Sequence, residues 1–219
     1  MEPAVVGALV AAFATAFGWI ANHYLTIQRD ARQRRAASAE EARTQRLLAA
    51  IRHVEAQLGE LYGPIVFRLH ENDRAFAELL IELGRSHVFL GDNSISEADL
   101  DLWLLWSDNV FLPNHATVCD LLRTKAHLIE GPNIPPSHLR FLDYYYSWRV
   151  YHDRWKTTGA RYRWHARENW PETFSAEVNE VFTLLKARHA RFLLQLDEVM
   201  KGASSIARPT HSLPARTSH

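Results

Sequence analysis

The sequence predicts an all-α protein in which an N-terminal transmembrane helix continues into a stalk and then into an up-and-down helical bundle of four or five helices. Three observations lead to this prediction. The segment from Pro3 to Gln28 has no formal charge, apolar residues then recur at intervals of three and four, and no segment alternates with period two. The 219 residues divide into a membrane anchor (1–28), a basic helical stalk (29–46), a helical bundle (47–202) and a disordered tail (203–219).

The N-terminal segment is long enough to cross a bilayer, because a span needs about 20 mostly apolar residues. Arg29, Arg32, Arg34 and Arg35 follow it at once, and basic residues favour the cytoplasmic side of a membrane. We therefore expect a single-pass protein with its N-terminus outside, its bundle in the cytoplasm and the lipid bilayer as a partner. A cleaved signal peptide and a buried core helix are the alternatives that the moderate hydrophobicity leaves open.

Small residues lie on one face of the expected span. Gly7, Ala11, Ala14 and Gly18 recur at intervals of four and three, and small side chains let membrane helices approach each other closely. This face predicts packing between spans in a homo-oligomer. The same pattern can also arise from composition, because the segment is rich in Ala and Gly.

The first helix of the bundle is expected to continue from the stalk through residues 47–61. Its apolar stripe suits either a coiled coil or the bundle core. Tyr62-Gly63-Pro64 then predicts a kink or a break, because proline lacks an amide hydrogen and disfavours the α conformation in the residue before it. A second helix is expected over residues 65–83, with Gly84 as its C-cap.

The third helix has the clearest start signal in the chain. With Ser96 as the N-cap, Asp99 is the third residue of the helix. The hydroxyl of an N-cap serine accepts a hydrogen bond from the backbone amide at that position. Pro113 is expected to break or kink this helix, and a further helix is expected over residues 114–130, before Gly131-Pro132.

Two prolines mark the starts of the last two long helices. Pro136 suits a first helical turn, and that helix is expected to reach Lys156. Residues 160–170 form either a short helix or a loop. A final helix is expected over residues 171–201, with Gly202 as its end. The expected core of the bundle consists of Leu69, Leu79, Trp103, Trp106, Leu122, Trp148, Trp155, Leu185 and Phe192.

Charge is distributed unevenly although the formal net charge is zero. Residues 29–52 carry seven basic and three acidic side chains, whereas residues 53–202 carry 16 basic and 21 acidic ones. A nucleic-acid-binding protein needs a basic folded surface, so we expect no nucleic-acid partner. The single cysteine, Cys119, excludes an intrachain disulfide framework and a metal site of several cysteines.

Local catalytic and cofactor motifs are absent from the sequence. The nine glycines form no G-x-G, there is no G-x-S-x-G, and no two of the 12 histidines lie within four residues of each other. We therefore expect no metal and no cofactor, and we favour a protein without enzymatic activity. His115 and Cys119 share a helix face and could form a thiolate–imidazole pair, but the apolar continuation of that face favours a buried cysteine beside a hydrogen-bonded histidine.

Residues 141–174 contain eleven aromatic side chains with polar residues between them. This composition is typical of a ligand pocket lined by aromatic rings, and also of a plain core with Tyr and Trp at its rim. The candidate ligand-binding residues are Asp143, Tyr145, Arg149 and His152. The last three are spaced by four and three residues, so they share one helix face.

Our leading functional hypothesis is a membrane-tethered helical interaction module that acts as a sensor, scaffold or regulatory subunit and binds a protein partner through its cytoplasmic bundle. The first alternative is a helical domain that binds or converts a small ligand with the aromatic segment 141–174. The second alternative is an effector that disrupts membranes through its oligomerised span.

Overall fold

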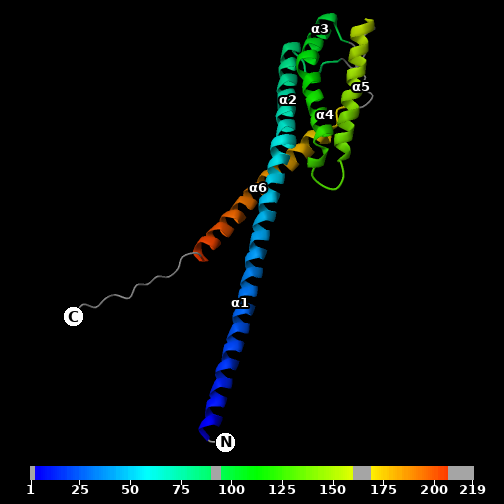
Figure 1. Ribbon diagram of the computed structural model, residues 1–219. Helices are drawn as coiled ribbons and strands as arrows, with labels where there is room; N and C mark the ends of the chain where they lie inside the picture. The colour runs from blue at the N-terminus through cyan, green and yellow to red at the C-terminus, as the bar shows by residue number, and fades with distance from the viewer. Residues whose placement is uncertain (1–2, 90–94, 160–168, 207–219) are drawn as a thin grey trace, which may run out of the picture. The chain divides into compact units, whose positions relative to one another are not determined.

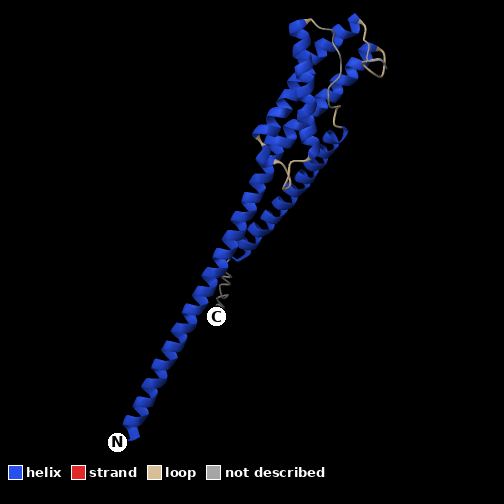
Figure 2. Cartoon of the chain, turned by 90° about the vertical axis from the view of Figure 1, so that its right-hand side faces the viewer, coloured by secondary structure: helices blue, strands red, loops and turns tan. Residues whose placement is uncertain are grey.

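The computed structural model describes residues 3–89, 95–159 and 169–206, and every regular element in these ranges is a helix (Figure 1; Figure 2). The predicted all-α class is confirmed. In chain order the elements are α1 (Pro3–Ala56), the π-helical turn η1 (Gln57–Tyr62), α2 (Gly63–Leu83), α3 (Glu97–Trp106), the π-helical turn η2 (Ser107–Phe111), α4 (Leu112–Thr124), the 3₁₀ turn η3 (Ala126–Leu128), α5 (Pro136–Thr158) and α6 (Glu172–Ile206).

The chain divides into two compact units, Met1–Ala49 with Leu196–His219, and Ala50–Gln195. In the first unit, α1 runs without interruption through the predicted anchor and stalk. Within the described residues, no helix combines the length and the apolar composition that a membrane span needs. Gly18 is exposed, and a Cβ added there would meet no atom within 4 Å. The side chains at positions 7, 11 and 14 lie outside the described part, so packing through this face stays a prediction.

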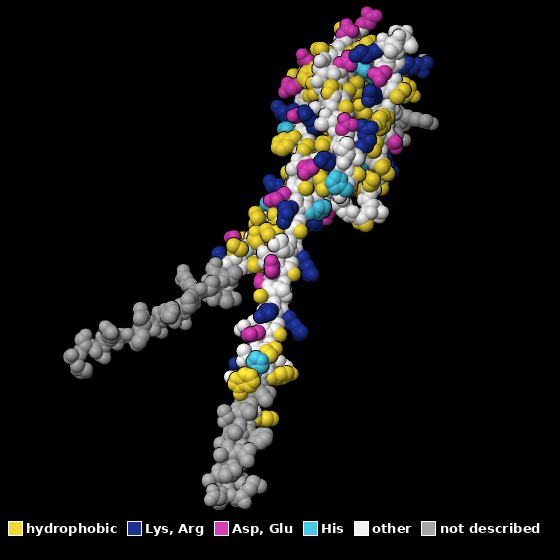
Figure 3. Space-filling model, viewed as in Figure 1, with side chains coloured by type: hydrophobic (Ala, Val, Ile, Leu, Met, Phe, Trp, Pro, Cys, Tyr) yellow, Lys and Arg dark blue, Asp and Glu magenta, His cyan; other side chains and the backbone are white. Residues whose placement is uncertain are grey.

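The second unit is an up-and-down bundle. α2 runs to one end, α3, η2 and α4 return along it, and α5 runs outward again beside α4 (Figure 1). The start of α6 adds Phe174, Val178 and Leu185 to the core. Acidic and basic side chains are interspersed on the face of the bundle that Figure 3 shows, with hydrophobic side chains between them.

Two clusters of buried side chains form the core of the bundle. One joins the end of α1, η1, α2, α4, α5 and α6, and the other joins α2, α3, η2 and α5. Of the predicted core, Trp106, Trp155 and Phe192 are only partly buried, whereas the six others are buried: Leu69, Leu79, Trp103, Leu122, Trp148 and Leu185.

The helical backbone continues through both prolines at which a kink or a break was expected, so neither proline breaks the helix. η1 and η2 each end two residues before a proline, Pro64 and Pro113. The intervening residues, Gly63 and Leu112, donate their amides to the carbonyl oxygens of the residues five positions earlier. In a regular α-helix a proline ring clashes with the carbonyl four residues before it, and the wider π turn leaves room for that ring.

Most of the predicted caps are confirmed. The backbone amide of Asp99 donates to Ser96 Oγ at 3.2 Å, and Gly84 adopts the left-handed conformation, with φ of 63°, that ends α2. Two predicted ends are wrong: α4 ends at Thr124 rather than near residue 130, and α6 continues past Gly202 to Ile206. The predicted loop at 91–94, residues 160–168 and the tail from 207 lie outside the described residues.

Candidate functional site

A cavity of about 370 Å³ lies within the bundle unit, among α2, α3, η2, α4 and α5. This volume falls within the range of about 300–1,000 Å³ that is usual for small-molecule sites. Six aromatic and three polar side chains line it: Phe76, Trp103, Phe111, Tyr144, Trp148, Trp170, Asn72, Asp73 and His115. Most of these side chains are buried, whereas Asp73 and Phe76 are exposed and mark its mouth.

The aromatic rings of the cavity support one another. Trp103 and Trp148 stack with their ring centroids 5.6 Å apart, and Phe111 lies 5.7 Å from Trp103. Tyr144 and Trp170 meet edge to face at 5.4 Å. Offset and edge-to-face pairs are the favourable arrangements of aromatic rings, so these contacts hold the walls in place.

The π turn η2 positions two of the relevant side chains. Phe111, at its end, is buried and reaches the cavity. Asp108, on the same turn, binds the α5 side chains His152 and Lys156. An extra residue in a helical turn re-aims the side chains that it carries, and such turns are frequent at functional sites. The π turn η2 therefore shapes one wall of the cavity.

A chain of hydrogen bonds orients the amide of Asn72, a residue of the cavity lining. Arg68 Nη1 donates to Asn114 Oδ1 at 3.2 Å, and Asn114 Nδ2 donates to Asn72 Oδ1 at 3.0 Å. Because arginine can only donate, it fixes the orientation of the Asn114 amide and, through it, that of Asn72. Asn72 Nδ2 is buried, and among the described atoms nothing accepts a hydrogen bond from it.

His115 is a buried and neutral side chain of the cavity lining. Burial lowers the pKa of its imidazole to about 3, and its ring lies 5.4 Å from that of Trp148 and 5.5 Å from that of Trp170. Its Nδ1 atom has no hydrogen-bond partner among the described residues. The hydrogen bond expected for this core histidine is therefore absent at Nδ1 among the described residues.

The cysteine one turn further along α4 is not reactive at neutral pH. Cys119 is fully buried, and burial raises the pKa of its thiol to about 12. Because His115 is neutral and the thiol is protonated, they form no thiolate–imidazolium pair. A buried cysteine, as the sequence favoured, is confirmed.

Asp73 supplies the charge at the mouth of the cavity. Burial raises the pKa of its carboxyl, and the charge of His70 acts in the opposite direction. Among the lining residues, Asp73 carries the one carboxylate, and neither Lys nor Arg is present. The described lining is thus aromatic, with a negative charge at its rim.

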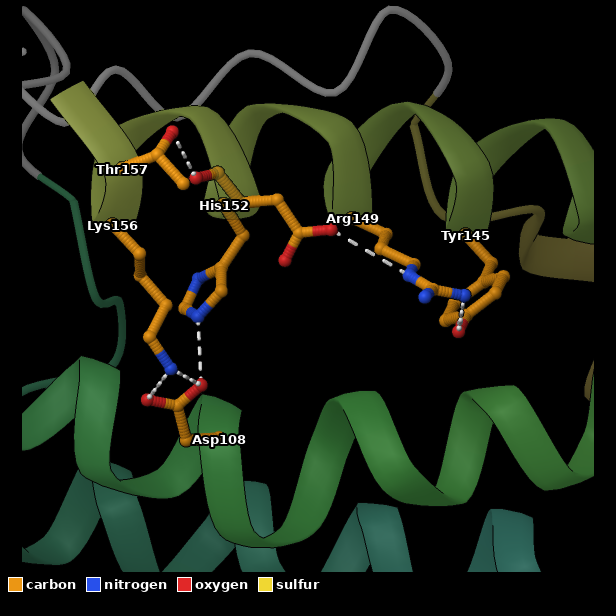
Figure 4. A network of polar contacts seen from close by, with 7 residues as sticks. Asp108, Tyr145, Arg149, His152, Lys156 and Thr157 are labelled. Carbon is orange, nitrogen blue, oxygen red and sulfur yellow. Dashed lines mark hydrogen bonds and ion pairs between the residues drawn. The ribbon is translucent and has the colours of Figure 1, made fainter.

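None of the four predicted ligand-binding residues is in the described lining of this cavity, and the structure joins Tyr145 to Arg149 but pairs His152 with Asp108. Asp143 is exposed. Tyr145 is buried, and its hydroxyl accepts a long hydrogen bond of 3.4 Å from Arg149 (Figure 4). His152 lies further along α5 and pairs with a different helix. Whether any of the four binds a ligand stays a prediction.

His152 connects α5 to η2. It is 1% exposed, and its Nε2 atom lies 2.8 Å from Asp108 Oδ1 (Figure 4). Lys156 Nζ lies 3.0 Å from the same oxygen. Although burial raises the pKa of Asp108, hydrogen bonds from both side chains outweigh that effect and hold the pKa below its ordinary value. This network fixes the turn that carries Phe111.

The sequence contained a signal for the polar part of the cavity that its analysis missed. The apolar stripe of the second helix passes through Leu69 and Phe76, and Asn72 occupies the position between them on that face. A polar residue at a buried register position needs a partner. The aromatic part was closer to the expectation, because Tyr144, Trp148 and Trp170 come from the segment 141–174.

In the described part of the chain, no three histidine, cysteine, aspartate or glutamate side chains are grouped so that they could hold a metal ion. Comparison with protein-family models, with curated proteins and with solved structures finds no match to this chain. The chemistry of the site therefore has to be argued from its own residues.

Proposed function

We propose that this chain is a membrane-tethered helical module whose bundle binds a small organic molecule in the aromatic cavity. The observation that carries the binding proposal is the cavity of about 370 Å³, whose described lining combines six aromatic rings with Asn72, Asp73 and His115. Pockets for small molecules combine apolar walls with a few polar groups that orient the ligand.

Energetics favour an occupied cavity. Protein interiors are packed nearly as densely as organic crystals, so an open space among six rings is unusual. A ligand that contacts the rings fills this space.

Binding is a better description of the site than catalysis. Among the described residues, the lining holds no Ser, Thr, Cys or Lys that could act as a nucleophile. Its imidazole has a pKa of about 3, far below neutral, so it is a weak general base. These features agree with a sensor or regulatory domain more closely than with an enzyme.

Binding can be tested with three probes that share one ring and differ in charge: indole, tryptamine and indole-3-acetate. Each is titrated by calorimetry into the full-length chain, and the melting temperature is followed by circular dichroism. A ligand at 100 times its Kd stabilises the fold by about 2.7 kcal/mol, which raises the melting temperature of a domain of this size by about 5–10 °C. No response to any of the three probes contradicts the proposal.

Two phenylalanines of α2 locate the bound probe. Phe76 lines the cavity, whereas Phe67 is 68% exposed and lies outside the lining. Phe76→Ala should weaken binding at least fivefold because it removes part of the wall, and Phe67→Ala should leave binding unchanged. Equal affinities in the two variants would place the probe elsewhere.

The membrane tether rests on the N-terminal sequence. Pro3 to Gln28 is uncharged and is followed by a cluster of arginines, which supports a single-pass anchor with its N-terminus outside and the bundle in the cytoplasm. Exposed Phe17, Trp19 and Tyr24 on α1 add support, because no described atom covers most of their surface. A homo-oligomer that packs through Gly7, Ala11, Ala14 and Gly18 belongs to the same proposal.

Topology needs a new reporter because the native thiol is buried. In a Cys119→Ser background, Ser38→Cys places an exposed thiol on the stalk. An impermeant maleimide should label it only after the cells are permeabilised. Labelling in intact cells contradicts the orientation, and recovery of the chain in the soluble fraction contradicts the tether. Leakage of a dye from vesicles would instead favour the membrane-disrupting effector.

A further inference from the structure

The charge of the cavity lining selects among possible ligands. Asp73 brings a carboxylate to the mouth, and His115 is neutral. Among the described residues no Lys or Arg lines the space. An anionic ligand would be repelled by the carboxylate and would find no counter-ion among the described lining residues. A cation, in contrast, gains an opposite charge at the rim.

The aromatic walls point in the same direction. The face of an aromatic ring carries the negative part of its quadrupole, so a cation within about 6 Å of a ring centroid is attracted, most strongly by Trp. Three tryptophans, Trp103, Trp148 and Trp170, contribute to the lining, together with Tyr144 and two phenylalanines. Trp103 and Trp148 are 4% and 2% exposed, so their interaction with a bound cation is only weakly screened by water.

We infer that the ligand of this cavity is a small organic cation, an alkylated ammonium compound. This inference rests on the proposed ligand-binding function and adds the chemical class. The ammonium group lies among the rings on the side of Asp73. The alkyl groups matter, because a bare ammonium ion is strongly hydrated and exposes no apolar surface to the rings.

Choline and its neutral counterpart provide the test. In 3,3-dimethylbutan-1-ol a carbon atom replaces the nitrogen of choline, so shape and hydroxyl group are kept while the charge is lost. Calorimetry on the full-length chain should show choline binding at least tenfold more tightly than the alcohol. The anion 3,3-dimethylbutanoate should bind more weakly than either.

Two carboxylates separate the local charge from the net charge. Asp73→Asn should weaken choline binding at least fivefold and leave the affinity for the neutral alcohol unchanged. Asp101→Asn makes the same change of charge at an exposed position of α3 outside the lining, and it should leave choline binding unaltered. Melting temperatures of both variants confirm that they fold.

The outcomes distinguish the inference of a cationic ligand from the proposal that the cavity binds a ligand. Equal binding of choline and the alcohol, or tighter binding of the anion, contradicts the inference of a cationic ligand, while the proposal of a ligand-binding site still stands. Binding of the indole probes without any binding of choline also overturns the inference of a cationic ligand. If neither series binds, the ligand-binding function itself fails.

Discussion

Protonation of His115 should destabilise the bundle in mild acid. In the native state burial holds the pKa of this imidazole at about 3, against 6.5 for the unperturbed group. Between these two values the unfolded chain therefore binds a proton that the native chain does not. The stabilisation from the neutral buried ring is fully present above pH 6.5 and decreases as the pH falls toward 3.

The magnitude follows from the width of the pH interval. Each pH unit in which only the unfolded state is protonated removes about 1.4 kcal/mol. Between pH 6.5 and pH 5, protonation at His115 should thus lower the free energy of unfolding by about 2 kcal/mol. For a chain of this length that corresponds to about 4–8 °C in melting temperature.

Two variants isolate this contribution. His115→Gln and His115→Phe both remove the titrating group, and they differ in how well they fill the site. Urea unfolding of each is followed by tryptophan fluorescence at pH 7.5, 6.5 and 5, which reports on Trp103 and Trp148 in the bundle. Their absolute stabilities should differ, whereas both should lose about 2 kcal/mol less than the wild-type chain between pH 6.5 and 5.

Other buried histidines do not affect this comparison. Burial also lowers the pKa of His138, which lies on α5 outside the cavity lining. That residue is present in all three proteins, so its titration cancels from the differences. If the two variants lose stability with acid as steeply as the wild-type chain, His115 is not held neutral by the fold, and the electrostatic argument for the cavity fails with it.

Two further predictions concern the helices that build the bundle. Gly63→Ala should lower the free energy of unfolding by about 1–3 kcal/mol, because a Cβ there would lie 2.4 Å from the backbone oxygen of Leu58. Gly59→Ala, where nothing lies within 4 Å, should raise the free energy of unfolding by about 0.5–1 kcal/mol. The opposite order of the two variants would contradict the π turn. Ser96→Ala should lower the free energy of unfolding by about 1 kcal/mol because it removes the cap of α3, while Ser96→Asp should retain most of the stability of the wild-type chain. Both variants are measured by urea unfolding, and equal stability of the two would exclude the cap.

Local sequence signals determined where most helices begin and end. Ser96 has a side-chain oxygen for the first amides of its helix, Pro136 needs no partner for a missing amide, and Gly84 adopts a left-handed conformation at little cost. These effects act within four residues along the chain. They could therefore be evaluated without knowledge of the fold, and most of them agree with the structure.

Proline predicted a kink or a break at two positions, and in the structure a π turn precedes each proline while the helical backbone continues. The penalty for Pro64 or Pro113 is calculated for a regular α-helix, in which its ring meets the carbonyl four residues earlier. A π turn changes that geometry, and the choice of a π turn over a break depends on burial of the residues on both sides. Tyr62 and Phe111 are both buried, so continuation of the helix keeps their rings in the core.

Only the tertiary structure determined the candidate site. Asn72 on α2, Trp103 on α3 and Trp148 on α5 are far apart in sequence, and they meet because the helices pack in one order and one rotation. Asp108 and His152 likewise meet across 44 residues. Helical periodicity shows which face of each helix is apolar, but the pairing of faces is set by side-chain packing among helices, and the cavity exists where that packing leaves space between six rings.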